Sequence, residues 1–464
     1  MIEVQDVDLL VIGGGKAGKS LAMDRAKAGW KVAMVERDKI GGTCINVACI
    51  PTKSLVGSAR TLLDARRAAV MGVELAGEPS ISLDLLREHK ESVVGGMVAA
   101  HAKMFPASGM DFMMGTARFT GDRTVEVALN DGGTRVLRGR DVVINTGTTP
   151  AVPPLDGIES ADVWNSETIL HLERIPESMI VLGGGYVGCE FASMFAVFGT
   201  KVILVQGRDQ VLPREDPDVA AGVAGVLSAQ GVELRLGARA RAVRREGGRE
   251  GRGDVVLTLE DGSEIRAEEL LAATGRAPVT GDLGIDVAGV ELTEKGFVAV
   301  DAHLRTSADH VWAVGDVAGS PQFTHASWND YRVLRKQLTG GEATTHGRLV
   351  PYTVFTTPEL ARIGLSETEA REQGYEVKVA RLDVAAIPRA KTLHDTTGTW
   401  KAVVDAATDR ILGVALLGHG SGEVLSAVQM AMLGGLPYQQ VRDAVITHPT
   451  MAEGLNLLFD TLGD

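Results

Sequence analysis

The chain has 464 residues, which suits two to four domains of one large enzyme and is too long for a small binding module. Hydrophobic residues make up 45% of the sequence, so a large core can be buried and the composition argues against a disordered chain. Its 47 Lys and Arg against 60 Asp and Glu give a net charge of −13, which argues against nucleic-acid and membrane partners.

Cysteine usage and the N-terminal sequence favour a cytoplasmic protein. Three cysteines are too few for a disulfide scaffold in a chain of this length. The first residues lack the basic and apolar regions of a signal peptide. No apolar run reaches the about 18 residues that a membrane-spanning helix needs.

A first βαβ unit is predicted near the N-terminus. The apolar run 8–12 is typical of a buried strand, a helix is expected to reach Gly29, and a second strand ends at Glu36. The loop between the first strand and the helix contains Gly13, Gly15 and Gly18. This glycine spacing lets backbone N–H groups bind a pyrophosphate. Since Glu36 follows where a carboxylate can hold a ribose diol, this unit predicts a dinucleotide site.

The same pattern returns 170 residues later, which indicates two related nucleotide-binding domains. A strand at 179–182 leads into a loop with Gly183, Gly185 and Gly188, then a helix to Gly199 and a strand at 201–205. The position that corresponds to Glu36 is Gln206, which would not repel a 2′-phosphate, and Arg208 could pair with one. Gln206 can also bind a plain ribose, so the pattern favours NADPH and leaves NADH open.

Two boundaries divide the remaining chain. The Pro-rich stretch 149–154 is typical of a linker, and a second boundary is expected near Arg276. From about residue 350, β-type segments at 400–404 and 411–417 precede an amphipathic helix at 422–433, which predicts an α+β domain suited to burial against a partner. The polar segment 244–253 is expected to be a solvated hairpin loop.

Two cysteines, Cys44 and Cys49, stand five positions apart between Gly42 and Lys53. On an ideal helix their Cα atoms would be about 8.7 Å apart, whereas a disulfide needs no more than about 6.8 Å. If they pair, the helix must be distorted, and the flanking glycines and Pro51 make this plausible. A disulfide in a cytoplasmic enzyme favours catalysis, while two buried apolar thiols are the alternative.

The segment 41–54, GGTCINVACIPTKS, closely resembles the active-site signature of the class I pyridine nucleotide-disulfide oxidoreductases. The resemblance runs through essentially the whole chain in the family's order. Its other parts are the turns 145–147 and 274–276, the Gly-Asp motif in 311–316, and the segments 355–359 and 448–453.

The resemblance implies a homodimer that binds FAD and NAD(P)H. The fold class is α/β, with two Rossmann-type dinucleotide-binding domains and a C-terminal α+β dimerisation domain. The implied segments are 1–149 and 277–348 for FAD, 150–276 for NAD(P), and 349–464 for the interface.

The family's catalytic roles fall on six residues of this sequence: Cys44, Cys49, His448, Glu453, Lys53 and Glu190. Cys44 resembles the interchange thiol that attacks the substrate, and Cys49 the thiol that makes a charge-transfer contact with the flavin. His448 and Glu453 resemble an acid/base pair, which thiol chemistry needs because it requires a proton carrier with a pKa near neutrality. In the family this pair reaches the cysteines of the other subunit.

Further roles concern the two cofactors. Lys53 resembles the lysine near flavin N5, paired with Glu190, and Tyr186 resembles the gate over the nicotinamide pocket. Asp316 matches the residue that binds the ribityl chain, and His325 and Ala326 are expected to open a helix that faces the flavin. Additional cofactor contacts are expected at Gly42, Thr43, Thr146, Gly147, Gly275, Arg276 and Gly315.

Several stretches resemble the mercuric-reductase-like branch, and most closely the bacterial reactive-chlorine-resistance flavin reductases, at 16–19, 190–195, 212–216 and 384–390. Mercuric reductase has a C-terminal cysteine pair that this chain lacks, and the third thiol, Cys189, is expected to be packing. Lipoamide dehydrogenase usually has Gly where Ala48 stands and an acid where Gln206 stands; Gln206 also departs from the acid expected in the reactive-chlorine group.

The sequence therefore predicts an FAD-dependent NAD(P)H oxidoreductase without a resident metal site. Electrons are expected to pass through the cysteine pair to an oxidant, to a metal ion of the Cu(II) or Hg(II) class, or to a small disulfide. The alternatives are a dihydrolipoamide dehydrogenase or other low-molecular-weight disulfide reductase, a flavin-bound redox sensor or interaction protein, and an NADH dehydrogenase or oxidase that uses no disulfide.

Overall fold

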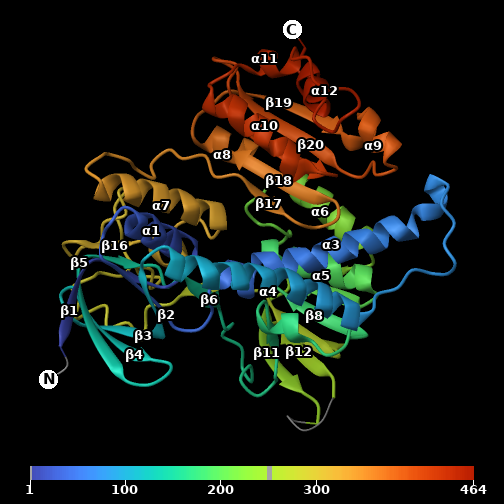
Figure 1. Ribbon diagram of the computed structural model, residues 1–464. Coiled ribbons are helices and arrows are strands. Elements are labelled where there is room, and N and C mark those ends of the chain that lie inside the picture. Colours follow the sequence, from blue (N-terminus) through green and yellow to red (C-terminus); the bar gives the residue numbers. More distant parts are fainter. Residues whose placement is uncertain (1–2, 248–252, 464) are drawn as a thin grey trace. The chain divides into compact units, whose positions relative to one another are not determined.

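A computed structural model describes residues 3–247 and 253–463, and the chain forms two compact units (Figure 1). Unit 1 comprises Met1–Ser54, Arg87–Ala151 and Arg276–Arg348. Unit 2 comprises Leu55–Leu86, Val152–Gly275 and Leu349–Asp464. The four-part domain division stays a prediction.

Unit 1 is built on a mixed sheet. Five strands run parallel in the order β16-β5-β1-β2-β3, and β4 joins β3 and β5 in antiparallel pairing. Leu10 and Ile12 of the central strand belong to one buried core, while Leu9 and Val11 belong to another together with residues of α1 and α7. The sheet is thus buried on both faces, as a continuous apolar strand predicts. Its elements are β1 (Val4–Ile12), β2 (Val32–Glu36), β3 (Asp111–Gly121), β4 (Thr124–Leu129), β5 (Thr134–Ile144), β16 (Val311–Ala313), α1 (Lys16–Lys27), α2 (Thr43–Asn46), η3 (Gly315–Ala318) and α7 (Thr324–Leu338).

Two long helices contribute residues to both units: α3 (Cys49–Arg66) and α4 (Leu83–Ala107). A short helix, η1 (Ala68–Met71), lies between them in the chain. Among residues 3–247 and 253–463, no helix is both long enough and apolar enough to cross a bilayer.

Unit 2 contains a second parallel sheet in the order β10-β9-β8-β14-β7 and an antiparallel sheet β11-β12-β13. The polar segment 244–253, expected as a hairpin loop, begins inside β11, which extends to Arg245, and its residues 248–252 lie outside the described residues. The elements are β7 (Trp164–Asn165), η2 (Thr168–His171), β8 (Ser178–Leu182), α5 (Tyr186–Phe198), β9 (Lys201–Val205), α6 (Pro217–Ala229), β10 (Glu233–Arg235), β11 (Ala240–Arg245), β12 (Val255–Leu259), β13 (Glu264–Ala267) and β14 (Glu269–Ala272).

The C-terminal part of unit 2 is an antiparallel sheet in the order β17-β18-β21-β20-β19. Helices α10 and α12 pack apolar residues into its core. The elements are β17 (Tyr352–Val354), β18 (Glu359–Gly364), α8 (Glu367–Glu372), β19 (Val377–Asp383), η4 (Val384–Ala386), α9 (Pro388–Thr392), β20 (Thr399–Asp405), β21 (Ile411–Gly418), α10 (Ser421–Leu433), α11 (Tyr438–Arg442) and α12 (Gly454–Asp460).

The α/β fold class predicted from the sequence is confirmed, with two local corrections. The first strand begins at Val4 instead of residue 8, because its polar residues pair in register with β5. The stretch 149–154 is not all linker, since β6 (Thr148–Pro150) pairs with β15 (Arg276–Pro278).

Candidate functional site

The first glycine loop connects β1 to α1 and closes tightly on itself. Gly13 has φ +103°, and a Cβ there would lie 2.3 Å from the carbonyl oxygen of Asn145. A Cβ on Gly18 would lie 2.7 Å from the carbonyl oxygen of Gly13. Gly15 is the N-cap of α1, so the first N–H groups of the helix open at this loop.

Glu36 stands at the end of β2 beside this loop. One carboxylate oxygen accepts a hydrogen bond of 2.8 Å from the backbone N–H of Gly14, and the other accepts one of 2.9 Å from Asp38 N–H. The carboxylate is therefore fixed next to the glycine loop, where a ribose diol would lie.

Two further loops of unit 1, after β2 and after β5, carry other residues expected to contact the cofactor. Gly42 packs so closely that a Cβ there would lie 2.8 Å from the Cα of Gly15, and Thr43 begins α2 directly after it. The hydroxyl of Thr146 donates to the carbonyl of Val279 at 2.7 Å, and Gly147 follows it. The contact between Gly42 and Gly15 leaves no room for a side chain at the glycine loop, and this suits the close approach of a pyrophosphate.

Asp316 lies in η3, next to Gly315. Its carboxylate accepts a 2.8 Å hydrogen bond from the hydroxyl of Thr148, which in turn accepts one of 2.8 Å from Arg276 Nε. Burial raises the pKa of Asp316 above its usual value, against the opposing effect of Thr148. Together with the glycine cradle and Glu36, this buried carboxylate fits FAD, which needs partners for a pyrophosphate and for hydroxyl groups.

The two cysteines of unit 1 lie beside a break between two helices. Helix α2 ends at Asn46, Val47 has φ −141° and ψ 12°, and α3 begins at Cys49. The segment is thus not one continuous helix, in keeping with the distortion expected for paired cysteines. Both side chains are present as thiols.

Thiol and hydroxyl groups meet at this break. The sulfur of Cys49 lies 3.5 Å from the hydroxyl of Thr324, the first residue of α7, and His325 and Ala326 follow in the first turn. The hydrogen bond with Cys49, followed by burial, raises the pKa of Cys44 well above its usual value. Cys44, Cys49 and Thr324 therefore form one polar cluster at the start of α3 and α7.

Lys53 and Glu190 belong to different units. Lys53 lies in the second turn of α3, in unit 1. Glu190 lies buried on α5 in unit 2, where its carboxylate accepts a 2.9 Å hydrogen bond from the backbone N–H of Phe355. Their pairing stays a prediction.

The second glycine loop repeats the geometry of the first. Gly183 has φ +110°, and a Cβ there would lie 2.5 Å from the carbonyl oxygen of Ala273. A Cβ on Gly188 would lie only 1.8 Å from the carbonyl oxygen of Gly183. Gly185 is the N-cap of α5, and Gly275 adopts φ +126° in the turn that follows β14.

Gln206 follows β9 and packs on this loop. A Cβ on Gly184 would lie 3.2 Å from its Cβ and Cγ, and its amide nitrogen donates to the carbonyl of Gln210 at 3.4 Å. Arg208 is exposed, and its carbonyl accepts a 2.8 Å hydrogen bond from Gly237 N–H.

Arg239 is a cation that sequence reasoning missed at this loop. A Cβ on Gly207 would lie 3.2 Å from the Cγ of Arg239, so the stem of this arginine rests on the loop between Gln206 and Arg208. No motif marks Arg239, because it follows β10, remote in sequence from the loop.

Tyr186 opens α5 and lies beside Tyr352 of β17, a neighbour that the sequence pattern did not indicate. The two ring centroids are 5.0 Å apart at an interplanar angle of 31°. Burial raises the pKa of Tyr186, while a hydrogen bond with Tyr352 works in the opposite direction. The hydroxyl of Tyr352 reaches the buried ion pair between Glu215 and Arg362.

His448 and Glu453 meet in unit 2. The Nδ1 atom of His448 lies 2.8 Å from a carboxylate oxygen of Glu453, which is buried. The imidazole itself has a side-chain exposure of 70%. A carboxylate thus orients an accessible ring, the arrangement that an acid/base histidine requires.

Cys189 shows no such environment. It is fully buried on α5, and burial raises its pKa to about 12. An inert packing role fits this position.

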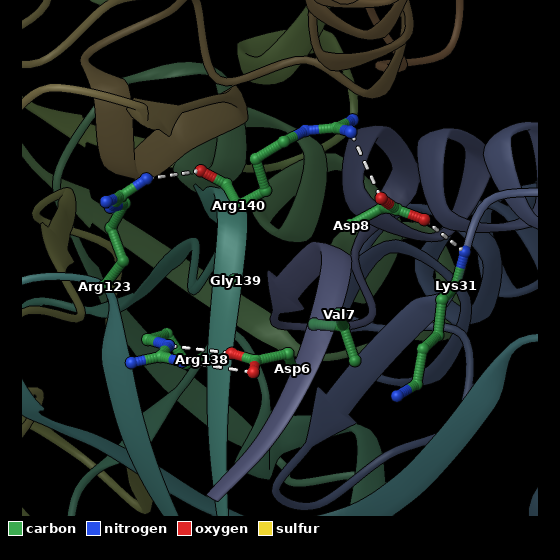
Figure 2. Close-up of a pocket in the computed structure, with 8 residues that line it drawn as sticks. All are labelled: Asp6, Val7, Asp8, Lys31, Arg123, Arg138, Gly139 and Arg140. Atoms are coloured by element: carbon green, nitrogen blue, oxygen red, sulfur yellow. Dashed lines mark hydrogen bonds and ion pairs between the residues drawn. The ribbon is translucent and has the colours of Figure 1, made fainter.

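A pocket of about 330 Å³ lies elsewhere in unit 1 (Figure 2). It is near the amino ends of β1 and β2, about 16 Å along β1 from the glycine loop at about 3.3 Å per residue. Two of its arginines are occupied, since Arg138 lies 2.7 Å from Asp6 and Arg140 lies 3.1 Å from Asp8. None of the residues expected to bind cofactors lines this pocket.

Known proteins resemble the chain over nearly its whole length. Residues 7–330 match the family described as pyridine nucleotide-disulphide oxidoreductase, and residues 350–458 match its dimerisation domain. The probable pyridine nucleotide-disulfide oxidoreductase RclA of Escherichia coli (strain K12) is 41% identical over 97% of this chain and 98% of its own length. A mercuric reductase of Streptomyces lividans is 36% identical over 98% of this chain and 96% of its own length.

A solved structure also resembles the chain over nearly its whole length. The Cu(II) complex of the HOCl-induced flavoprotein disulfide reductase RclA from Escherichia coli matches with a TM-score of 0.89 and 39% identity, covering 98% of this chain and 99% of that one. The resemblance inferred from the active-site segment is thereby confirmed. The chain belongs to the pyridine nucleotide-disulphide oxidoreductase family of flavoprotein enzymes.

Proposed function

We propose that this enzyme passes an electron pair from NAD(P)H through FAD and the Cys44–Cys49 pair to an oxidant, to a metal ion of the Cu(II) or Hg(II) class, or to a small disulfide. The observation that carries this proposal is the cluster of Cys44, Cys49 and Thr324 at a break between helices. Two thiols in contact beside the start of a helix are suited to reversible oxidation.

The cofactors have a defined place in the proposal. FAD, when bound, supplies the two-electron chemistry that connects NAD(P)H with the cysteine pair. The glycine loop with Gly13, Gly15 and Gly18 would hold its pyrophosphate, Glu36 its ribose and Asp316 its ribityl hydroxyls. The second loop with Gly183, Gly185 and Gly188 would hold NAD(P)H, with Tyr186 over the nicotinamide pocket.

Proton transfer is assigned to His448. Its Nδ1 atom is held by Glu453, so the Nε2 atom is left to take a proton from a thiol or to give one to a departing thiolate. In the proposed homodimer this imidazole serves the cysteine pair of the partner. The dimerisation-domain match supports the dimer, as does the exposed apolar end of α10, where Met430 and Leu433 are each 60% exposed.

The thiols and the relatives support a ranking of the acceptor classes. Similar proteins are described as a Cu(II) complex of an HOCl-induced reductase and as a mercuric reductase. We therefore rank oxidants and metal ions first. A small disulfide is the second candidate, because a thiolate attacks disulfides directly.

We further propose that NADPH is used at least as well as NADH. Gln206 brings no negative charge to the loop after β9. Arg208 belongs to this loop, and the Cγ of Arg239 would lie 3.2 Å from a Cβ on Gly207, so two exposed arginines lie at the loop. A 2′-phosphate would find charge-assisted partners there. A cytoplasmic location is part of the proposal, because thiols are kept reduced in that compartment.

An acceptor screen tests the proposal. The holoenzyme is mixed under anaerobic conditions with NADPH or NADH and with Cu(II), Hg(II), quinones or disulfides, and oxygen is assayed separately. We expect turnover with an oxidant or a metal ion that is lost in Cys44→Ser and kept in the matched variant Cys189→Ser. Equal turnover in Cys44→Ser would contradict the proposed electron path.

A further inference from the structure

A lysine that no motif assigns lies buried next to the cysteine loop. Lys19 is in the second turn of α1 and is only 3% exposed. Its ammonium group donates a 2.9 Å hydrogen bond to the carbonyl oxygen of Gly41, three residues before Cys44. Among residues 3–247 and 253–463, no carboxylate forms an ion pair with it. A buried cation held by one neutral carbonyl is costly unless an anion also forms nearby.

The charged and titratable groups around Lys19 come from four elements. Burial, followed by the charge of Lys16 on the same helix, lowers the pKa of Lys19 to about 8. Cys44 on α2 and Glu36 on β2 act in the opposite direction. His101 on α4 is also affected, since burial lowers its pKa and Lys19 adds to this effect. At neutral pH Lys19 is therefore mainly a cation.

Of the two possible anions, Glu36 is already engaged. Its carboxylate oxygens accept hydrogen bonds from the backbone N–H groups of Gly14 and Asp38. Cys44 becomes anionic only as a thiolate, a form that its hydrogen bond with Thr324 also favours. The charge of Lys19 favours that thiolate, against the effects of Cys49 and of burial.

We propose that Lys19 is a positioning residue whose ammonium group, fixed by Gly41, stabilises the thiolate of Cys44 in the reduced enzyme. Two electrons and one proton convert the Cys44–Cys49 disulfide into one thiol and one thiolate. The proton is on Cys44 when the Cys49 thiolate contacts the flavin, and it is on Cys49 when the Cys44 thiolate attacks. When the Cys44 thiolate attacks a disulfide acceptor, one S–S bond forms, the acceptor's S–S bond breaks, and the second acceptor sulfur leaves as a thiolate. The inference rests on the proposed function only for this attacking role.

The test measures thiolate reactivity instead of turnover. The reduced holoenzyme is alkylated with iodoacetamide under anaerobic conditions from pH 5.5 to 9.5, and Cys44 and Cys49 are followed separately by peptide mass spectrometry. Lys19→Gln removes the charge and keeps an N–H donor for Gly41, whereas Lys19→Arg keeps the charge. Lys27→Met removes an exposed lysine from the end of the same helix and serves as the matched control.

We expect Lys19→Gln to shift the pH midpoint of Cys44 alkylation upward by about one unit and to slow alkylation about tenfold at pH 7. Lys19→Arg and Lys27→Met should stay within about twofold of the unmodified enzyme. An unchanged midpoint in Lys19→Gln overturns the inference. If Lys19→Gln fails to fold, Lys19→Arg decides the question. A pH midpoint of Cys44 alkylation equal to that of the unmodified enzyme supports the inference. A midpoint shifted to that of a free thiol overturns it.

Two further outcomes are informative. If Lys19→Gln weakens FAD binding and leaves the Cys44 midpoint unchanged, the charge serves the cofactor phosphate and the inference is wrong. Because alkylation needs no electron acceptor, failure of the acceptor screen leaves this result intact, so the two proposals are tested separately.

Discussion

The hydroxyl of Tyr352 donates a 2.5 Å hydrogen bond to the carboxylate of Glu215, whose side chain is only 1% exposed. Arg362 lies 3.1 Å from the other carboxylate oxygen, so a buried ion pair stands behind the tyrosine. Tyr352 in turn contacts Tyr186, the first residue of α5, which follows the second glycine loop. The side chain expected over the nicotinamide pocket is therefore supported by a polar network.

Replacing Tyr352 with Phe should remove a buried hydrogen bond without removing the ring. We expect a loss of about 1–3 kcal/mol in the free energy of unfolding, together with a changed KM for the nicotinamide nucleotide. Thermal denaturation and steady-state kinetics measure the two effects. Tyr375→Phe is the matched control because Tyr375 is exposed. Equal stability of the two variants would show that the hydroxyl contributes nothing to the network.

The cysteine pair should give a spectroscopic signature. Two-electron reduction of the yellow holoenzyme is expected to produce a long-wavelength band from the Cys49 thiolate and the flavin. Cys49→Ser should abolish this band, and Cys189→Ser should keep it because Cys189 is buried and protonated. Persistence of both the band and full activity in Cys49→Ser would exclude the pair as the electron relay.

Loss of the acid/base histidine should be repairable between subunits. His448→Ala is expected to lower kcat by about 10²- to 10⁴-fold, and Glu453→Gln by less, because it retains a group that can hold Nδ1. Mixing Cys44→Ser with His448→Ala subunits should restore part of the activity through one intact hybrid site. Absence of recovery, with subunit exchange demonstrated, would place the proton carrier elsewhere.

Nicotinamide choice should respond to charge at the loop after β9. Arg208→Ala and Arg239→Ala are each expected to reduce kcat/KM for NADPH about tenfold to a hundredfold, equivalent to about 1.5–3 kcal/mol, and to leave NADH nearly unchanged. Gln206→Glu should shift the ratio toward NADH. Arg241→Ala is the control, since this exposed arginine lies on β11. A strong NADH preference in the unmodified enzyme would mean that Gln206 serves the ribose.

Acid stability should depend on Asp216. Burial alone would raise its pKa, but hydrogen bonds from Thr368 and Glu367 and the ammonium group of Lys401 hold that pKa well below its usual range. A depressed carboxyl pKa stabilises the folded state above the unfolded-state pKa of about 3.9 and loses this contribution as the pH falls below it. Asp216→Asn should flatten the loss of stability in urea titrations between pH 5 and 2. The exposed variant Asp309→Asn should retain the full slope.

Periodicity and glycine spacing predicted the two βαβ units and their glycine loops, because these depend on local backbone geometry. The predicted first strand was too short, because the polar residues at its start gave no apolar signal although they pair with β5. Tyr352 and Arg239 were missed for a different reason. Each reaches its loop through tertiary packing, and neither stands at a fixed offset from a motif. Lys19 was visible only as part of a family-like stretch, because the burial of a single lysine side chain has no sequence pattern.

The two glycine loops share their geometry and differ at the end of the following strand, where Glu36 meets one loop and Gln206 the other. In both loops a third-glycine Cβ would strike the carbonyl of the first, at 2.7 Å and 1.8 Å, so neither loop tolerates variation there. In the proposed function, selectivity for a coenzyme thus depends on residues other than the glycines that would bind its pyrophosphate. On this proposal, a designer who wished to exchange the electron donor would keep the glycine loops and replace a few side chains after β9.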